Sequence, residues 1–132
     1  MNDHRLLNDH RLLIVDDDPD IRDALASIIR QEGYEVDEAP DGRAALAYLR
    51  AAANKPCVVL LDLMMPIMSG WDLVGEVSQD DALKAIPIVL LTADPRGART
   101  DPRTSALPVF PKPLDLGELL TAIGRHCCGS PS

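Results

Sequence analysis

The sequence predicts an α/β fold in which helices cover both faces of a parallel β-sheet. Short, continuous apolar runs alternate along the chain with stretches whose apolar residues recur at helical spacing. Strands that are apolar throughout are typical of parallel sheets, because such sheets are buried on both faces. Four of the runs end in a polar residue, and ligand sites in open parallel sheets lie at the carboxyl ends of the strands. These observations place a candidate site at one edge of the sheet.

Apolar segments and helix start and stop signals define the expected elements in order. The strands are expected at residues 11–15, 34–39, 57–61, 87–91 and 107–110. The first helix begins where Asp18 precedes Pro19, because a capping side chain followed by proline is a typical helix start, and it ends at Gly33. Three further helices are expected at 41–52, at 70–77, and behind the capping-box-like pair Asp115 and Glu118 through Ile123.

The segment over 93–105 fits this pattern poorly. Alternation requires a helix there, but the segment contains Pro95, Gly97 and Pro102, and its only apolar side chains are Ala93 and Ala98. Because no amphipathic face can be drawn, the fourth helix is expected to be short, displaced or irregular.

Length and composition indicate one domain with an aliphatic core. The chain has 132 residues, of which 46% are hydrophobic but only 3% are aromatic, so the core is expected to consist of Leu, Ile, Val, Ala and Met. The hexapeptide at 2–7 is repeated at 8–13, and only the second copy continues into the first strand. We therefore expect a disordered extension over 1–10, the domain over 11–126 and a tail over 127–132.

The charge and cysteine content argue against several classes of function. A net charge of −8 without a Lys/Arg cluster argues against direct nucleic-acid binding. No apolar run approaches the roughly 20 residues that span a bilayer, and the N-terminus is unlike a signal peptide, so a cytoplasmic location without membrane association is expected. The odd set of Cys57, Cys127 and Cys128 does not suggest a disulfide framework, and the sequence around His126 matches no zinc pattern.

The polar residues that follow the strands suggest one assembled site. They are Asp16, Asp17, Asp62, Thr92 and Lys112. Three neighbouring carboxylates repel one another unless a cation is present, and hard oxygen ligands near water suit Mg²⁺. An amine and a hydroxyl beside them suit a phosphoryl group, whose oxygens Mg²⁺ and Lys112 would neutralise and Thr92 would hydrogen-bond. Asp62 would then be the nucleophile in a phosphoryl transfer.

Four motifs carry a resemblance to a known family. They are Ile14-Val15-Asp16-Asp17-Asp18-Pro19, Leu60-Leu61-Asp62-Leu63-Met64-Met65-Pro66-Ile67-Met68-Ser69-Gly70, Leu90-Leu91-Thr92-Ala93 and Pro111-Lys112-Pro113. Together they resemble the receiver domain of bacterial two-component response regulators, specifically the single-domain, chemotaxis-type kind, over roughly 11–125. The resemblance implies a flavodoxin-like, doubly wound, five-stranded parallel sheet of order 2-1-3-4-5.

The resemblance also implies a separate role for each carboxylate. Asp62 would accept a phosphoryl group from a phosphohistidine on a sensor histidine kinase or a histidine phosphotransfer protein. Asp17, Asp62 and the backbone carbonyl of Met64 would bind Mg²⁺ directly, and Asp16 would help through water. For Asp18, a role as helix cap is favoured over a role as metal ligand.

The remaining implied roles are those of a switch and not of a turnover enzyme. Thr92 would move toward phosphorylated Asp62, and Lys112 would pair with it. Met64 and Asp94 occupy the variable positions that, in this family, tune dephosphorylation. The chain would promote only its own phosphorylation and dephosphorylation, and its conformational change would reach a downstream protein partner that the sequence does not identify.

One departure from the family pattern leaves alternatives open. Receivers usually carry an aromatic residue three positions before the lysine, where this chain has Val109, and Phe110 lies on the other face of the strand. A pseudo-receiver that acts as a constitutive protein-interaction module is therefore one alternative. A receiver fragment of a hybrid histidine kinase is another, because the Gly/Ser/Pro tail resembles the start of a linker. A third alternative, a hydrolase of the phosphatase kind, would need a second acid two residues after Asp62, where this chain has Met64.

Overall fold

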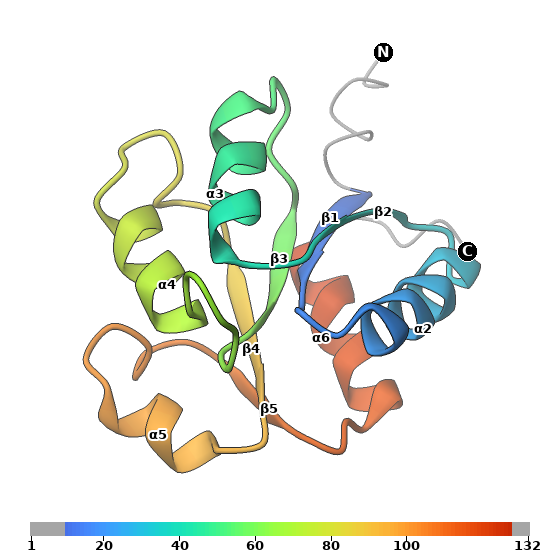
Figure 1. The fold of residues 1–132 in the computed structure, drawn as a ribbon. Helices are drawn as coiled ribbons and strands as arrows, with labels where there is room; N and C mark the ends of the chain where they lie inside the picture. The colour runs from blue at the N-terminus through green and yellow to red at the C-terminus, as the bar shows by residue number, and fades with distance from the viewer. Residues whose placement is uncertain (1–9, 128–132) are drawn as a thin grey trace.

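A computed structural model describes residues 10–127 and shows a five-stranded, all-parallel sheet in the order β2-β1-β3-β4-β5 (Figure 1). The strands are β1 (Arg11–Val15), β2 (Glu35–Ala39), β3 (Val58–Asp62), β4 (Ile88–Thr92) and β5 (Val109–Pro111). The expected doubly wound fold and its strand order are confirmed. The hexapeptide repeat and the predicted extension lie largely outside the described residues, as does most of the predicted tail.

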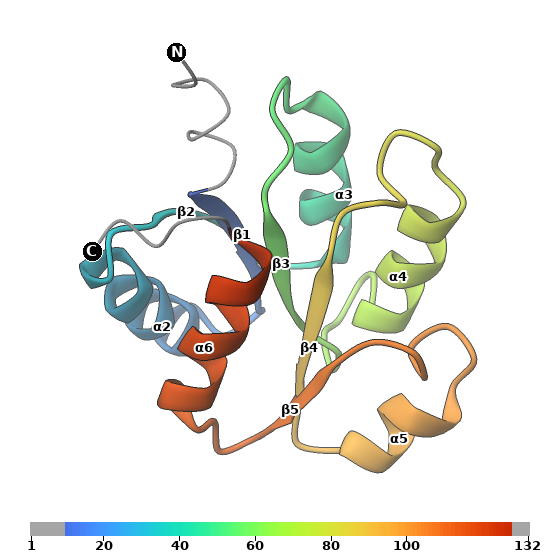
Figure 2. The same cartoon turned by 180° about the vertical axis from the view of Figure 1, so that it is seen from behind.

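Helices cover both faces of this sheet (Figures 1 and 2). They are α2 (Pro19–Gln31), α3 (Gly42–Ala51), α4 (Gly70–Ser78), α5 (Pro95–Thr100) and α6 (Leu116–His126). Helices α2 and α6 pack on one face, and α3 and α4 pack on the other with α5 beyond them at the β5 end. Within the described residues, no helix is long and apolar enough to cross a membrane.

Alternating side chains of each strand supply the two halves of the core. Leu60 packs with the α2 and α6 side of the sheet, whereas its neighbours Val59 and Leu61 pack with the α3 and α4 side. This alternation follows from the two-residue period of an extended chain. Because both faces are covered, every residue of β3 and β4 is buried, which explains why these strands are apolar up to their last positions.

Side-chain caps start the helices at the carboxyl edge of the sheet. Asp18 accepts hydrogen bonds from the backbone N–H groups of Asp20 (3.0 Å) and Ile21 (3.2 Å), so its predicted role as the cap of α2 is confirmed. Other helices begin at Asp41, Ser69, Asp94 and Asp115, whose side chains accept backbone hydrogen bonds in the same way. The loops that carry the site therefore lead directly into fixed helix ends.

The weak segment contains a short helix, as expected. Helix α5 spans only Pro95–Thr100, and a turn follows it. The buried side chain of Thr104 donates a hydrogen bond to the carbonyl of Ala98 (2.5 Å), and Arg103 pairs with Asp72 of α4 (3.2 Å). Polar contacts of these side chains hold the segment in place where an amphipathic face is missing.

The cysteine pattern was interpreted wrongly. Cys57, directly before β3, and Cys127, directly after α6, form a disulfide across a sequence separation of 70 residues. Cys127 is fully buried and packs with the core on the α2 and α6 side of the sheet. An odd cysteine count argues only against complete pairing, and it does not show which two cysteines the fold brings together.

Candidate functional site

Parallel pairing brings the polar strand ends to one edge of the sheet. Asp62 is the last residue of β3 and lies opposite Leu91 of β4, and Thr92 lies opposite Pro111 of β5. The backbone N–H of Lys112 donates to the carbonyl of Thr92 (2.9 Å), which extends this alignment past the end of β5. The side chains predicted from the sequence therefore come from adjacent strands in register.

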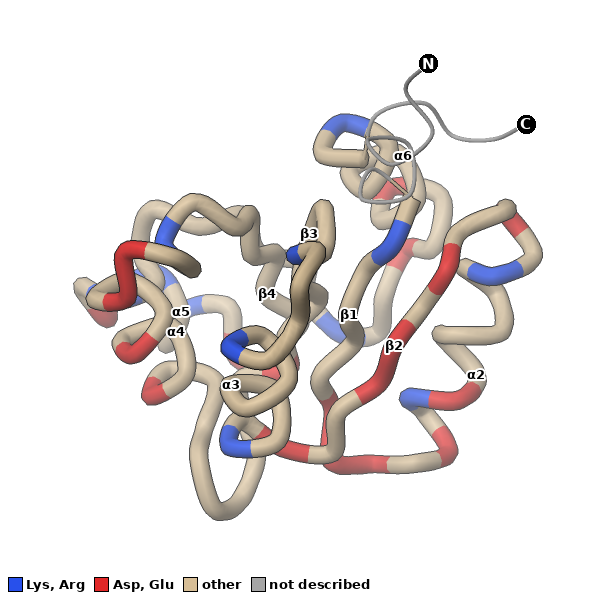
Figure 3. Tube along the Cα trace, turned by 90° about the horizontal axis from the view of Figure 1, so that it is seen from above, with Lys and Arg blue, Asp and Glu red and all other residues tan. Residues whose placement is uncertain are grey.

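Three carboxylates meet at this edge. Oxygen atoms of Asp16, Asp17 and Asp62 all lie within 4.8 Å of one another. Asp16 and Asp62 are buried, and Asp17 is exposed, so the cluster opens to solvent on one side. Figure 3 shows acidic positions both where β1 leads into α2 and along β2. Hard oxygen donors at this spacing, with access to water, fit a divalent cation of the Mg²⁺ type.

Burial makes Asp62 the most perturbed acid of the cluster. Loss of hydration raises the pKa of Asp62 above its ordinary value, and the charges of Asp16 and Asp17 raise it further. The ammonium group of Lys112 and the backbone N–H of Met64 act in the opposite direction but do not cancel the effect. A bound cation would relieve the same repulsion, so the electrostatics of the cluster favour occupancy by a metal ion.

Lys112 lies beside the carboxylates without a tight contact to any of them. Its Nζ atom is 3.6 Å from Asp62 Oδ1 and 3.7 Å from Asp16 Oδ2, distances of an ion pair and longer than a hydrogen bond. The peptide bond between Lys112 and Pro113 is cis. The ammonium group is therefore placed to neutralise an anionic group that arrives on Asp62.

Thr92 completes the site from β4. Its side chain is fully buried, and its Oγ1 atom accepts a hydrogen bond from the backbone N–H of Asp94 (2.9 Å). That bond uses a lone pair of the oxygen, so the hydroxyl hydrogen can still be donated. The Thr92 hydroxyl thus keeps a hydrogen to donate at this edge of the sheet while the start of α5 remains attached to its oxygen.

The loop after β3 folds back tightly onto the strand end. A Cβ atom on Gly70 would lie 2.7 Å from the Cα of Leu63, so only glycine fits there. Ile67 has a φ of 69°, a left-handed conformation that a β-branched residue rarely adopts. The Met64 N–H bonds to Asp62 Oδ1 (3.2 Å), whereas the predicted role of the Met64 carbonyl as a metal ligand stays a prediction.

Two features near the site were missed by the sequence reasoning. Arg22 donates to the backbone carbonyl of Asp16 (2.8 Å) and to Glu38 (3.0 Å), and thereby fixes the loop that carries the first two carboxylates. An arginine one turn into a helix gives no sequence signal for such a contact. The second feature is an apolar groove beside Lys112.

This groove, the α2–α6 groove, has a volume of about 610 Å³. It is lined by Ile21, Ala24, Leu25 and Ile28 of α2, by Lys112, Pro113 and Leu114 of the loop after β5, and by Leu116 at the start of α6. Ile21 and Leu116 are 47% and 38% exposed, high values for large apolar side chains. The sequence places both at helical spacing, but it does not show that the core leaves them uncovered.

Comparison with known proteins agrees with the fold. Residues 12–124 match the family profile of the response regulator receiver domain. The chain is 34% identical over 125 residues to an uncharacterised 14.6 kDa protein of Leptolyngbya boryana, covering 91% of this chain and 92% of that one. It is 41% identical over 108 residues to the response regulator PleD of Caulobacter vibrioides, covering 80% of this chain but only 23% of PleD.

A solved structure extends the comparison to three dimensions. The response regulator TrrA of Thermotoga maritima, crystallised with Mg²⁺ and BeF, superposes with a TM-score of 0.77 at 34% identity, over 87% of this chain and 96% of that one. The class defined by the fold and the site is thus a CheY-like signalling switch of two-component systems. The chain belongs to the family of response regulator receiver domains, as the motifs predicted.

Proposed function

We propose that this chain is a phosphoacceptor receiver in which Asp62 takes a phosphoryl group from a phosphohistidine. The observation that carries the proposal is the placement of a buried Asp62 between two further acids and the Lys112 ammonium group, each within 4.8 Å of a carboxylate oxygen. The donor is a sensor histidine kinase or a histidine phosphotransfer protein, and the reaction takes place in the cytoplasm.

The proposed transfer balances without a further reactant. A carboxylate oxygen of Asp62 forms a bond to phosphorus while the bond between phosphorus and the donor imidazole breaks, and the imidazole nitrogen keeps the electron pair and takes up a proton. Bound Mg²⁺ supplies neutralisation of the phosphoryl charge. Asp16, Asp17, Asp62 and the Met64 carbonyl would hold it, since hard oxygen donors cluster there.

The remaining residues hold the new group after transfer. The Lys112 ammonium group would pair with a phosphoryl oxygen, because it already lies 3.6 Å from Asp62 and has no tight contact to give up. The Thr92 hydroxyl would turn its hydrogen toward another oxygen. Either contact pulls on β4 or β5, so the state of Asp62 is transmitted to the loops that follow these strands.

The α2–α6 groove suits the phosphodonor. Lys112 lines both the groove and the site, so a protein that packs on Ile21 and Leu116 brings its own side chains to the edge where Asp62 lies. We propose that the occupant is the histidine-bearing helix of the kinase or phosphotransfer protein. A helix with an apolar face fits such a groove, because it covers the exposed apolar side chains on both partners.

The test is the intact mass of the protein after incubation with acetyl phosphate, with and without Mg²⁺. We expect a Mg²⁺-dependent gain of one phosphoryl group that is absent from Asp62→Asn. Asp18→Asn is the matched control, because Asp18 is a neighbouring exposed acid that acts as a helix cap, and asparagine caps equally well. A folded protein that gains no phosphoryl group from any small donor would contradict the proposal.

One observation favours a second candidate, a constitutive interaction module. Val109 takes the place of the usual aromatic residue and is packed against the core, so no ring can rotate there on phosphorylation. If this candidate is right, a partner captured by the chain binds wild type and Asp62→Asn equally, with or without acetyl phosphate. Phosphorylation-dependent binding would support the receiver proposal instead.

A further inference from the structure

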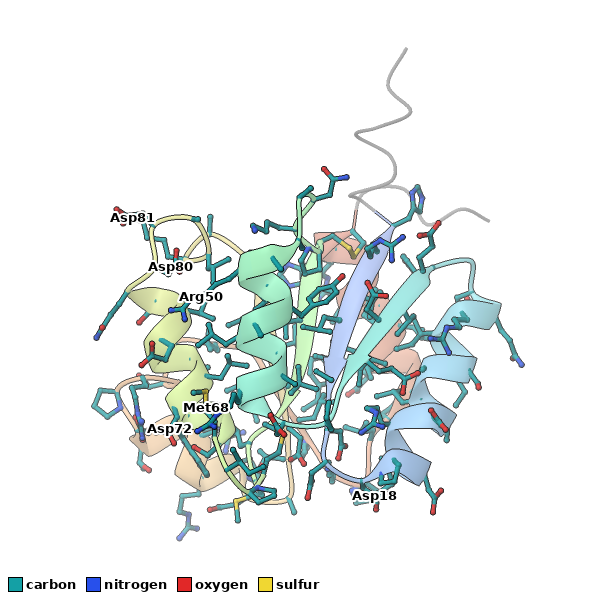
Figure 4. The ribbon with its side chains drawn as sticks, turned by 45° about the horizontal axis from the view of Figure 1, so that its top comes forward. Asp18, Arg50, Met68, Asp72, Asp80 and Asp81 are labelled. Carbon is teal, nitrogen blue, oxygen red and sulfur yellow. A yellow bond between two sulfur atoms is a disulfide. The ribbon has the colours of Figure 1, made fainter. Side chains whose placement is uncertain are left out.

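The disulfide lies at the end of the sheet opposite the carboxylate cluster. Cys57 precedes β3, whose last residue is Asp62, and Cys127 caps the C-terminal end of α6. Figure 4 shows the S–S bond in yellow at the end of the sheet where β1 begins, with Asp18 labelled at the far end. The bond therefore has no direct contact with the phosphoacceptor site.

The fold holds the two cysteines together without help from their bond. The backbone N–H of Cys57 donates to Arg11 at the start of β1, and that of Cys127 donates to Ile123 of α6 (both 2.8 Å). Ile123 is itself fully buried against the sheet. The two Cα atoms lie 5.3 Å apart, within the usual range for a disulfide, so reduction would leave a dithiol that is preorganised to close again.

Access to the two sulfur atoms is unequal. Cys127 is fully buried, whereas Cys57 is partly exposed and lines a cavity of about 360 Å³. Lys55 and His126 line the same cavity, and the ammonium group of Lys55 donates to the carbonyls of Leu49 and Ala52 (both 2.7 Å). A positive charge at the cavity favours the thiolate form of a cysteine and attracts an anionic thiol. Exchange with a small molecule must therefore begin at Cys57.

We propose that Cys57 and Cys127 are a reversible redox modification site, oxidised by a low-molecular-weight disulfide of the glutathione class. The Cys57 thiolate attacks one sulfur of that disulfide and releases one small thiolate, which takes up the proton that Cys57 lost. The Cys127 thiolate then attacks the Cys57 sulfur and releases the second small thiolate. Two electrons pass from the protein to the small disulfide, which leaves as two thiols.

Reversibility of this disulfide is expected from the compartment in which the protein is proposed to work. Persistent disulfides are rare in the cytoplasm, and those that form there are usually transient or redox-sensing. Only this choice of compartment rests on the proposed function; the pairing and its order of exchange rest on the fold. Oxidation would fix the last turn of α6 to the start of β3 and leave the carboxylate cluster unchanged.

The test measures free thiols in the full-length, folded protein across a series of ratios of reduced to oxidised glutathione. Samples are quenched in acid, unfolded in urea at neutral pH in the presence of excess maleimide so that every free thiol reacts, and their mass is measured. We expect three alkylations at reducing ratios and one at oxidising ratios, with a peptide map that links Cys57 to Cys127. Alkylation of all thiols at every ratio, or a link that involves Cys128, would overturn the proposal.

Cysteine variants test the order of exchange. In Cys127→Ala/Cys128→Ser, glutathione should accumulate as a mixed disulfide on Cys57, because no second protein thiol remains to displace it. In Cys57→Ser, Cys127 should stay unmodified, because it is buried. Cys128→Ser is the matched control and should retain the switch with no alkylation in its oxidised form. A mixed disulfide on Cys127 in folded Cys57→Ser would contradict the proposal.

The same samples separate this proposal from the proposed function. Oxidised and reduced protein should take up a phosphoryl group from acetyl phosphate at rates within about twofold, because single changes far from a site leave it largely independent. Failure of both forms to be phosphorylated would count against the phosphoacceptor and leave the thiol result standing. If only the reduced form failed to be phosphorylated, the proposal that the disulfide and the phosphoacceptor site act independently would be overturned.

Discussion

At the scale of single residues, the site combines groups that are unfavourable on their own. Asp62 sits at a buried strand end beside two other acids, and its nearest cation is at ion-pair distance. A fold retains such an arrangement at the expense of stability, because buried like charges repel. The sequence showed the acids, the hydroxyl and the amine directly, since each follows an apolar run. It did not show Arg22, because its contact is to a backbone carbonyl that no pattern marks.

The raised pKa of Asp62 gives a pH-dependent prediction. Because the folded state binds this proton more tightly than the unfolded state does, Asp62 lowers stability above its folded-state pKa and has no such effect below its ordinary value. Asp62→Asn should therefore raise the free energy of unfolding at pH 7, without Mg²⁺, by on the order of 1 kcal/mol.

Urea unfolding at several pH values measures this effect. The gain from Asp62→Asn should shrink as the pH falls toward 4, where the wild-type carboxyl is increasingly neutral. Added Mg²⁺ should stabilise the wild type more than the variant, because it binds the intact cluster. Equal gains at pH 4 and pH 7 would show that repulsion in the cluster is not the cause.

At the scale of elements, the β3–α4 loop is held by close backbone approach. Gly70→Ala places a Cβ 2.7 Å from the Leu63 Cα, so we expect a loss of about 1–3 kcal/mol in the free energy of unfolding. Gly124→Ala is the matched control, because Gly124 is an exposed position of α6 with nothing within 4 Å of the added atom. That change should stabilise by about 0.5–1 kcal/mol, since alanine favours helix. Thermal unfolding should show a lower Tm than wild type for Gly70→Ala and a higher Tm for Gly124→Ala.

The α2–α6 groove gives a prediction about the phosphodonor. Ile21→Glu places a charge at a side chain that is already 47% exposed, so folding should tolerate it. Transfer from a purified histidine kinase that phosphorylates the wild type should slow by about tenfold or more, the usual scale for loss of an interface anchor. The rate with acetyl phosphate should not change.

Two outcomes would argue against the groove as the docking surface. Equal slowing with the kinase and with acetyl phosphate would show that Ile21→Glu disturbs Asp62 itself. Unchanged transfer from the kinase would show that the donor binds elsewhere. Ser27→Glu, which introduces the same charge at an exposed position of α2 outside the groove lining, serves as the control for substitution on this helix.

At the scale of the whole molecule, some features of the fold and the site could be predicted from the sequence and others could not. The parallel sheet covered on both faces followed from the apolar runs, its strand order followed from the family resemblance, and the short α5 followed from Pro95 and Gly97. The pairing of Cys57 with Cys127 could not be predicted, because a distance over 70 residues depends on how α6 crosses the sheet. The uncovered state of Ile21 and Leu116 is equally a property of packing and not of sequence.

The disulfide should contribute substantially to global stability. Closing a loop of this length is expected to restrict the unfolded chain by about 4 kcal/mol in the loop-entropy description. Reduced wild type should therefore unfold at clearly lower urea than oxidised wild type, while Cys57→Ser should be insensitive to reductant. Equal midpoints for the oxidised and reduced wild type would show that the bond does not restrict the unfolded chain.

The same bond makes residues 57–127 a covalently closed ring that contains β3, β4 and β5 and leaves β1 and β2 outside it. A force applied at the C-terminus, such as that of a processive protease, would then act through the sulfur atoms directly on the start of β3. That strand lies between β1 and β4 in the middle of the sheet, the part hardest to extract. Oxidised protein should therefore resist degradation from its C-terminal end, and the lifetime of the molecule would follow the redox state of its surroundings.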